Sequence, residues 1–282
     1  MRSDVTVIAA ACNEESQVAA WLETVRWAER VVVVDTGSRD GTIAALEAAG
    51  VEVLRMDVGA PESVTGVAVV HAAKNLAIDQ VRSGWILDLD LDERVPDALA
   101  DEIRRVTDRD GAGPIAYAIP FRHYVFGRWL QHGGWRGAHR RLYRAGCARY
   151  PEDRAHSTLE VDGEIGELEQ FVVHFAHPTI HEFLVKMNRY TSHDAPLIAA
   201  HGRGGLRNRP PLPVSRWAWS RAALSVFWNR YIKARGFRDG VAGFIVAVAL
   251  AMYIFVEQLK VWELRNVVDD REPEDPRAGA LA

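Results

Sequence analysis

Cysteine is scarce in this chain of 282 residues, which contains only Cys12 and Cys147. Two cysteines exclude a scaffold held together by several disulfides and are typical of a protein from a reducing compartment. The first fifteen residues, MRSDVTVIAAACNEE, include an asparagine and two glutamates and lack the long apolar core of a signal peptide. We therefore expect the N-terminal part of the chain to be cytosolic.

The chain also lacks an excess of charge of either sign, since 34 Lys and Arg face 38 Asp and Glu. This balance gives no indication of a nucleic-acid partner. Acidic residues are nevertheless absent from two stretches, 111–151 with seven Arg and 203–238 with nine Lys or Arg. Both stretches are rich in aromatic residues, and a generic solvated surface explains only part of this composition.

The first hundred residues alternate short β-branched runs with helical patterns, which is typical of a parallel α/β sheet. The patterns predict strands at 5–10, 31–35, 51–57 and 85–90, and helices at 15–27, 42–49 and 67–81. The strand runs are nearly continuous in apolar residues, so we expect helices on both faces of the sheet. No GxGxxG motif follows the first strand, which argues against a dinucleotide-binding domain.

The rest of the chain predicts further strands and then long helices. Strand patterns occur at 115–121, 139–143 and 171–175, and a helical pattern at 180–200. We predict a catalytic domain over 1–202 with halves 1–110 and 111–202, a linker over 203–213, helices within 214–266 and a polar tail over 267–282.

The C-terminal helical region combines an apolar run with a basic, aromatic neighbour. The uncharged run 241–256 has 16 residues, or about 24 Å of helix, which is short of a hydrocarbon core of about 30 Å. Basic and aromatic residues in 214–234 suit an anionic cytoplasmic leaflet. We predict amphipathic helices at the membrane interface. The alternative is a helical pair that packs on the domain or forms a homo-oligomer.

The strongest chemical pattern is WILDLDLDERV at 85–95. If the strand continues through this segment, Asp90 and Asp92 face the same side, because residues two apart share a face. Two carboxylates that close repel each other unless a cation lies between them, and hard oxygen ligands suit Mg²⁺ or Mn²⁺. The alternative is a solvated, Asp-rich turn before Pro96 in which Asp92 or Glu93 serves the following helix.

Polar residues also follow the first two predicted strands. Asn13 and Glu14 come after the first strand, and Asp35 ends the second. In an open α/β sheet, ligands bind beyond the carboxyl ends of the strands. A carboxylate at Asp35 can accept hydrogen bonds from the ribose or base of a nucleotide, whereas Asp40 is predicted to cap a helix.

The motifs AACNEE, VVDTGSRDGT, AAKNLAI and LDLDERV resemble the nucleotide-sugar half of family 2 glycosyltransferases, which have the GT-A fold. The resemblance implies a Rossmann-like, mostly parallel sheet in which 1–110 binds the donor and 111–202 the acceptor. It assigns Asp35 to the base, Lys74 and Asn75 to the diphosphate, and Asp90 and Asp92 to the Asp-X-Asp motif. Asp92 is then the direct ligand of Mn²⁺ or Mg²⁺, with Ala10, Asn13 and Glu14 beside the donor and Asp88 outside the motif.

The resemblance extends over nearly the whole chain. The segments FGRWLQHGGWRGAHRRLYRAG, HSTLEVDGEIG, VVHFAHPTIHEFLVKMNRYTSHDA and GFRDGVAGFIVAVALAMYIFVEQLK resemble bacterial glycosyltransferases similar to the lipopolysaccharide core β-glucosyltransferase. The chain is thus expected to be an enzyme, a hexosyltransferase of the cell envelope.

The acceptor half departs from the group at one position. The group's pattern has Glu directly after the residue that corresponds to His156, where this chain has Ser157. An inverting transfer needs a base near the acceptor hydroxyl, and this is usually a carboxylate. Asp153, with Glu152 beside it, is the candidate in this chain.

Two further side chains have open interpretations. His174 is either an additional metal ligand or a hydrogen-bonded structural histidine. Arg140, like Arg136 and Arg141, either binds a phosphate of donor or acceptor or lies on an exposed strand face.

These observations predict a metal-dependent, inverting transfer of a hexose from a nucleoside diphosphate donor, a UDP-sugar, to an envelope glycan or lipid-linked acceptor. The enzyme would be cytoplasmic and peripheral to the inner face of the cytoplasmic membrane. One alternative is a polyprenyl-phosphate glycosyltransferase. The other is a catalytically silent nucleotide-binding protein at the membrane.

Overall fold

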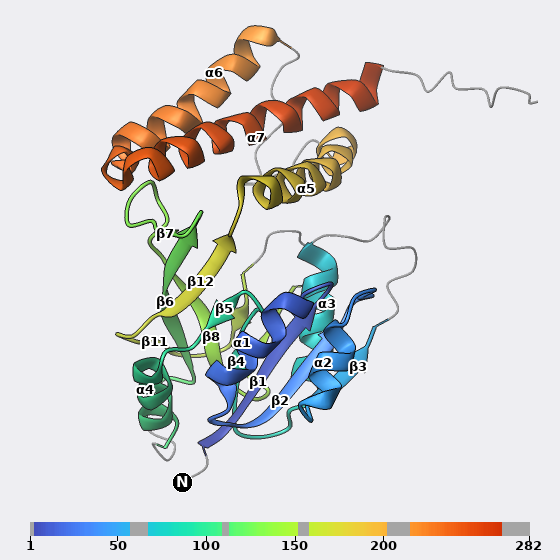
Figure 1. The fold of residues 1–282 in the computed structure, drawn as a ribbon, viewed down its shortest axis with the longest axis vertical. Helices are drawn as coiled ribbons and strands as arrows, with labels where there is room; N and C mark the ends of the chain where they lie inside the picture. The colour runs from blue at the N-terminus through green and yellow to red at the C-terminus, as the bar shows by residue number, and fades with distance from the viewer. Residues whose placement is uncertain (1–2, 57–66, 109–112, 152–157, 202–214, 267–282) are drawn as a thin grey trace, which may run out of the picture.

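The structure is a computed structural model that describes residues 3–56, 67–108, 113–151, 158–201 and 215–266. A twisted sheet with flanking helices forms one end of the molecule, and three long helices form the other (Figure 1). The strands are β1 (Ser3–Ala11), β2 (Ala28–Asp35), β3 (Glu52–Arg55), β4 (Trp85–Asp88), β5 (Glu93–Arg94), β6 (Ala116–Val125), β7 (Arg128–Trp129), β8 (Ala138–Arg144), β9 (Ala148–Arg149), β10 (Glu160–Val161), β11 (Ile165–Glu167) and β12 (Val172–His177). The α-helices are α1 (Glu15–Val25), α2 (Thr42–Ala48), α3 (Val67–Ile78), α4 (Asp97–Thr107), α5 (Ile180–His201), α6 (Arg216–Phe227) and α7 (Gly240–Asn266).

The main sheet has the strand order β3-β2-β1-β4-β8-β6-β12-β5. Strands β3, β2, β1 and β4 are parallel, β8 is antiparallel to both β4 and β6, and β12 is parallel to β6. The edge strand β5 pairs with β12 in the antiparallel direction. The sheet is therefore parallel in the first half of the chain and mixed in the second.

Helices cover both faces of the parallel strands because successive side chains of a buried strand point to opposite faces. Val33 packs in a core with residues of α1, α2 and α4, whereas its neighbours Val32 and Val34 pack in a second core with residues of α3. The predicted fold class, an α/β sheet that is mostly parallel and covered on both sides, is confirmed.

The predicted strands and helices are found close to their expected positions, with one consequential difference. The strand expected over 85–90 ends at Asp88, and the following residues form a turn that leads to β5. The prediction that Asp90 and Asp92 lie on one face of an extended strand is therefore wrong.

Helices α5, α6 and α7 pack against one another at the end of the molecule away from α2 and β3 (Figure 1). Between α6 and α7 the chain forms a π-helix, Trp228–Lys233, and a 3₁₀ turn, Gly236–Asp239. The side chain of Asp239 accepts hydrogen bonds from the backbone N–H groups of Gln131 and His132 at 3.2 and 2.8 Å. This contact attaches the helical end to the loop that follows β7.

The segment Gly236–Asn266 spans 31 residues and is long and apolar enough, by length and composition, to cross a membrane. One third of its most apolar window is buried inside the protein, where Phe183 and Met187 of α5 pack with Ala249, Tyr253 and Ile254 of α7. Core helices of soluble proteins have the same composition, so the interfacial location of these helices stays a prediction. The expected boundary at 203–213 and the tail over 267–282 lie outside the described residues.

Candidate functional site

The candidate site lies at the point where the strand order reverses. Strand β1 is central, with β2 and β3 on one side and β4 on the other, so the connection from β3 to β4 crosses the sheet. Ligands of open α/β sheets bind at such a switch point, outside the carboxyl ends of the strands. Here the carboxyl ends of β1, β2 and β4 lead into the loops with Asn13, Asp35 and Asp90.

The loops after β1 and β2 hold each other in place. The Ser38 hydroxyl accepts a hydrogen bond from the Asn13 backbone N–H at 2.9 Å, and the Asn13 side-chain oxygen accepts one from the Arg39 N–H at 2.8 Å. Asn13 has a φ of 57°, a conformation that asparagine adopts more readily than most residues. Ala10 belongs to β1 and pairs with Val34 in β2. The two strand ends thus form one joined rim.

Asp35 is buried and shapes the β2 loop. Its carboxylate accepts hydrogen bonds from the backbone N–H groups of Gly37 and Ser38 at 2.9 and 3.0 Å. Gly37 has a φ of 107°, which only glycine adopts without strain. The turn around Asp35 is therefore fixed by local contacts, and the binding of a nucleotide base by Asp35 stays a prediction.

The carboxylates of Asp88 and Asp90 belong to a buried ion network. Lys74 Nζ from α3 lies 2.7 Å from Asp88 Oδ1 and 2.6 Å from Asp90 Oδ1. Arg141 from β8 lies 3.1 Å from Asp88, 3.0 Å from Asp90 and 2.8 Å from Glu93. The hydroxyl of Tyr150 also donates to Asp88. Asp88, expected outside the motif, is thus a central member of this network.

Burial disfavours the charged forms of Asp90 and Lys74, but the opposite charges beside them have a larger effect on their pKa values. Burial disfavours the ionised form of Asp90, yet the charges of Lys74 and Arg141 lower the pKa of this carboxyl far below its usual range. For Lys74 the opposing effect of burial is outweighed by Asp88 and Asp90, which raise its pKa. Both side chains are therefore charged at neutral pH.

The structure places Asp90 and Lys74 in one ion network. Each oxygen of Asp90 pairs with a cation of the protein, Oδ1 with Lys74 and Oδ2 with Arg141. Lys74 is buried between the two aspartates, and it holds the turn after β4. The binding of a metal ion by Asp90 and of the donor diphosphate by Lys74 stays a prediction.

Asn75 is held by the chain that follows β9. Its amide donates to the Tyr150 carbonyl at 2.9 Å, and its side-chain oxygen accepts a hydrogen bond from the Tyr150 N–H at 3.0 Å. Both ends of this buried amide thus fix the backbone at Tyr150. A contact of Asn75 with the donor diphosphate stays a prediction.

The two neighbouring arginines of β8 have different contacts. Arg140 is exposed and donates to the Leu159 carbonyl at 3.0 Å. Arg141 pairs with Asp88, Asp90 and Glu93 in the carboxylate network. Phosphate binding by Arg140 stays a prediction.

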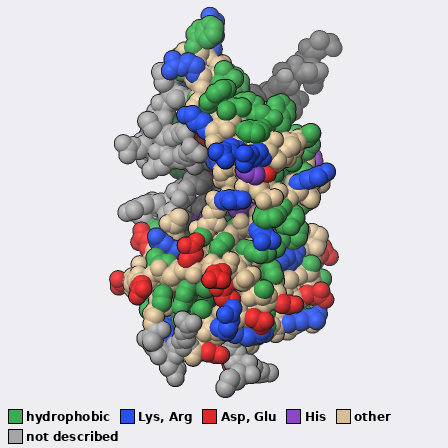
Figure 2. All heavy atoms as spheres, turned by 90° about the vertical axis from the view of Figure 1, so that its left-hand side faces the viewer, with side chains coloured by type: hydrophobic (Ala, Val, Ile, Leu, Met, Phe, Trp, Pro, Cys, Tyr) green, Lys and Arg blue, Asp and Glu red, His purple; other side chains and the backbone are tan. Residues whose placement is uncertain are grey.

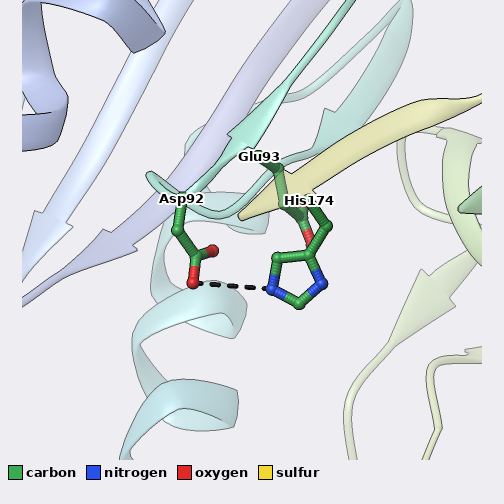
Figure 3. Close-up of side chains that lie close together, drawn as sticks. All are labelled: Asp92, Glu93 and His174. Atoms are coloured by element: carbon green, nitrogen blue, oxygen red, sulfur yellow. Dashed lines mark ion pairs between the residues drawn. The ribbon is translucent and has the colours of Figure 1, made fainter. Parts of the chain in front are cut away.

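A second cluster contains Asp92, Glu93 and His174, whose side chains point toward one another (Figure 3). One ligand atom from each lies within 4.8 Å of the other two, and His174 Nε2 is 3.5 Å from Asp92 Oδ2. Strand pairing produces this arrangement, because Glu93 of β5 lies opposite His174 of β12. The backbone N–H of Phe175 also donates to the Asp92 carbonyl at 2.9 Å.

Burial and neighbouring charges both shift the pKa values of Asp92, Glu93 and His174. Burial opposes the charged forms of Asp92 and His174, but their mutual hydrogen bond lowers the pKa of Asp92 and raises the pKa of His174. Burial raises the pKa of Glu93 to about 7, in spite of the charge of Arg141. A bound divalent cation would favour the ionised form of all three carboxylates, Asp90 included.

The cluster fits a small, hard cation. Two carboxylates and one imidazole are a donor set that Mn²⁺ accepts, and carboxylate oxygens suit Mg²⁺ as well. The Asp92 side chain is 19% exposed and that of Glu93 only 1%. Both oxygens of Glu93 accept hydrogen bonds, Oε1 from Arg141 and Oε2 from the Asp90 backbone N–H. The structure places His174 beside Asp92, and metal binding by these residues stays a prediction.

His123 fixes the ring of His174. The Nδ1 atoms of the two imidazoles lie 2.9 Å apart, so one ring donates and the other accepts. With Nδ1 used in this way, Nε2 of His174 remains directed at Asp92. A ligating histidine commonly has its second nitrogen held by such a partner.

Helix α5 brings positive charge to the site from a distant part of the chain. Lys186 Nζ lies 3.6 Å from Asp92 Oδ2. Glu14 is close enough to feel the same groups: burial and the charges of Asp92 and Asp90 raise its pKa to about 7, while Lys186 and Arg189 act in the opposite direction. The sequence shows only a lysine and an arginine three apart on a helix, a pattern too common to single them out.

Glu152, Asp153 and Ser157 lie outside the described residues. The described chain reaches Tyr150 and Pro151 on one side of this segment and Thr158 on the other. Tyr150 is hydrogen-bonded to both Asn75 and Asp88.

Known proteins similar to this chain include glycosyltransferases. No family model matches the chain. A lipopolysaccharide core biosynthesis glycosyltransferase of Rhizobium meliloti is 25% identical over 266 residues, which cover 89% of each chain. A glycosyltransferase of Rickettsia conorii is 24% identical over 266 residues, covering 89% of this chain and 87% of its own. The resemblance expected from the motifs is confirmed, and so is the expected enzyme class.

Similar solved structures include S. aureus TarS, with 14% identity over 93% of this chain and 91% of its own and a TM-score of 0.38. Glucosyl-3-phosphoglycerate synthase of Mycobacterium tuberculosis, solved with Mn²⁺, UDP-glucose and phosphoglyceric acid, has 20% identity over 43% of this chain and 44% of its own, with a TM-score of 0.34. A mycobacterial protein matches 74% of this chain and 82% of its own at 16% identity and a TM-score of 0.42.

Proposed function

We propose that this chain, a glycosyltransferase, moves a hexose from a UDP-sugar to a lipopolysaccharide-core or other cell-envelope acceptor, with Mn²⁺ or Mg²⁺ and with inversion at the anomeric carbon. The observation that carries the proposal is the cluster of Asp92, Glu93 and His174 at the switch point of the sheet. Asp35 ends β2, and Glu14 follows β1 at the N-terminus of α1. A nucleotide on β1 and β2 would thus bring its diphosphate to the cluster.

The described residues would have separate roles in binding the metal ion and the donor diphosphate. Asp92 and His174 would hold the metal ion, with Glu93 behind them. A bound divalent ion neutralises the negative charge that develops on a leaving diphosphate. Lys186, 3.6 Å from Asp92, would add positive charge on the side of α5. Lys74 and Arg141 would keep the turn after β4 in the geometry that presents Asp92.

The acceptor step requires a base in the acceptor half. A carboxylate there would remove the proton of the acceptor hydroxyl while that oxygen attacks the anomeric carbon from the face opposite the diphosphate. Asp153 is our candidate, with Glu152 beside it in the sequence. Both follow Tyr150, which is attached to Asp88.

An envelope acceptor is supported by the relative from Rhizobium meliloti, which is named for lipopolysaccharide core biosynthesis. It is also supported by the surface of the C-terminal helices. Large apolar side chains are exposed there, among them Trp217 at 70% and Val241 at 74%. Such a surface suits peripheral binding to the inner face of the cytoplasmic membrane, where lipid-borne acceptors are found. Contact between two copies through α6 and α7 would bury the same surface.

The proposal is tested by thermal unfolding in the presence of nucleotide sugars, with and without Mn²⁺. A ligand that binds only the folded state raises the midpoint, by about 2.7 kcal/mol of stability at a concentration 100 times Kd. We expect UDP-glucose or another UDP-sugar to raise the midpoint by several degrees with Mn²⁺ and much less without it. GDP- and CMP-sugars are the controls. An equal rise for every nucleotide, or none with Mn²⁺, would contradict the UDP and metal assignments.

A further inference from the structure

A cavity of about 260 Å³ lies between α5, α7 and the π-helix, beside the loop that follows β7. The larger part of its lining is apolar or aromatic and comes from Trp135, Phe183, Met187, Tyr190, Leu250 and Tyr253. The remaining side chains that line it are His177, Lys186 and Arg230. No acidic residue is among the described residues of the lining, although Asp194 contacts Tyr253 and Asp92 lies near Lys186. The cavity is thus an apolar chamber with positive charge at its wall.

Two residues connect this cavity with the metal-binding cluster. Lys186 lines the cavity, and its Nζ lies 3.6 Å from Asp92 Oδ2. Trp135 also lines it, and its ring centre is 5.4 Å from that of His123, the partner of His174. A molecule in the cavity would therefore lie one side chain away from the ligands of the metal.

The cavity has few polar groups, and three of them have partners within the protein, whereas the buried Nδ1 of His177 has no hydrogen-bond partner among the described residues. Lys186 donates to the Ala176 carbonyl, Arg230 donates to the Gly133 and Gly134 carbonyls, and the Tyr253 hydroxyl donates to Asp194. Burial lowers the pKa of His177 to about 4, so this ring is neutral at physiological pH. The net charge of the lining thus comes from Lys186 and Arg230.

This lining decides between two kinds of occupant. A sugar ring would bring several hydroxyl groups into a space that offers few free partners, and each buried hydroxyl without a partner weakens binding. An aliphatic chain needs no hydrogen bonds and gains affinity with every methylene group removed from water. At about 30 Å³ for each small group, the cavity has room for roughly eight or nine heavy atoms.

We propose that this cavity binds the aliphatic chain of a lipid phosphate from the membrane, with the phosphate paired to Lys186 beside Asp92. The inference rests on the proposed function and deepens it, because it narrows the cell-envelope acceptor to a lipid phosphate. An ionised phosphate oxygen would then take the place of the acceptor hydroxyl and bond to the anomeric carbon as the bond to the departing UDP breaks, without the need for a base. It favours the polyprenyl-phosphate alternative over a soluble glycan.

The surface around the helices supports a membrane source. Leu224 and Trp228 are exposed near the C-terminal end of α6, and Phe244 is exposed near the start of α7. Figure 2 shows hydrophobic side chains gathered at the helical end of the molecule, with Lys and Arg side chains beside them. A lipid that leaves the bilayer at this surface would meet the basic residues and then the cavity.

The experiment measures the binding of n-butyl and n-octyl phosphate to the full chain by calorimetry, below the micellar concentration of each. Each buried methylene group increases the affinity by a factor of about four. We therefore expect octyl phosphate to bind at least tenfold more tightly than butyl phosphate. Octyltrimethylammonium, with the opposite charge, should bind at least tenfold more weakly than octyl phosphate.

Variants then locate the binding. Leu250→Trp places a larger side chain in the cavity and should reduce the affinity for octyl phosphate at least tenfold, to the level of butyl phosphate. Leu250→Phe makes the same test if the Trp variant does not fold. Met252→Trp is the matched control, since Met252 is on the same helix and 47% exposed. Lys186→Met should weaken the binding of both phosphates.

The outcomes separate this inference from the proposed function. UDP release from a UDP-sugar with Mn²⁺ and no acceptor should be unchanged in Leu250→Trp, and its absence from the wild-type protein would count against the proposed function alone. Octyl phosphate binding that survives both Leu250 variants would overturn the cavity assignment. Tighter binding of glucose 1-phosphate than of octyl phosphate, lost in Leu250→Trp, would make the cavity a glycan site and overturn the lipid assignment.

Discussion

Replacement of Asp92 by alanine is expected to reduce metal-dependent sugar transfer and donor hydrolysis by about 1,000-fold or more. A metal ion contributes several kcal/mol to stabilisation of the charge in a transition state, and a 1,000-fold loss corresponds to about 4 kcal/mol. Asp92 holds His174 at 3.5 Å and is only partly exposed, so its loss removes a ligand without opening the core. The measurement is UDP release from a UDP-sugar with Mn²⁺, with and without acceptor.

The fold of this variant should persist. Asp92 and His174 are mostly buried, so the loss of one partner should cost up to about 3 kcal/mol, and the unfolding midpoint of Asp92→Ala should fall by no more than roughly 12 °C. Asp101→Ala is the control, because Asp101 is an exposed carboxylate of α4 paired with Arg104. Full activity in Asp92→Ala would refute the metal assignment.

Replacement of Lys74 by methionine is expected to have the largest effect on stability. Lys74 is buried between Asp88 and Asp90, and removal of one partner from a buried ion pair costs about 3–5 kcal/mol. For a chain of this size the unfolding midpoint should fall by roughly 6–20 °C. Thermal unfolding followed by circular dichroism, in the absence of ligand, measures the effect.

A surface pair serves as the control for this variant. Arg55 and Glu47 are 3.2 Å apart with both side chains exposed, so Arg55→Met should cost less than about 1 kcal/mol. If Lys74→Met instead unfolds like the wild-type protein but binds UDP much more weakly, Lys74 contacts the diphosphate, as the family resemblance implies, and the ion network is of little importance.

Much of the donor half could be predicted from local sequence. The apolar runs around Ile8, Val33 and Ile86 are strands covered on both faces, and such runs have few alternatives. Polar residues directly after these strands lie at one edge for the same topological reason. His174 could be proposed as a ligand because it follows an apolar run in the acceptor half, and the structure does place it beside Asp92.

The sequence could not predict that Asp90 and Asp92 contact different partners, because these contacts depend on where β4 ends. A strand that continued to Asp90 would have put Asp90 and Asp92 together, but the turn after Asp88 sends Asp90 to Lys74 and Asp92 to His174. The preference for Arg141 over Arg140 depends on which face of β8 meets this turn. Sequence alone shows two adjacent arginines of equal character.

The contributions of Glu93 and Lys186 depend on contacts between distant segments. Glu93 meets His174 only because β5 pairs with β12. Lys186 reaches Asp92 only because α5 begins beside the end of β12. Neither residue has a local pattern that separates it from the other charged residues of the chain.

The central claim is that Asp92, Glu93 and His174 form the metal site, and pulsed electron paramagnetic resonance of Mn²⁺ bound with UDP tests it most directly. The account predicts coupling of the manganese to an imidazole nitrogen in the wild-type protein. That coupling should vanish in His174→Gln, and Mn²⁺ affinity should fall in Asp92→Ala. Manganese that binds with UDP in the wild-type protein without nitrogen coupling, or that binds Asp92→Ala with undiminished affinity, would contradict it.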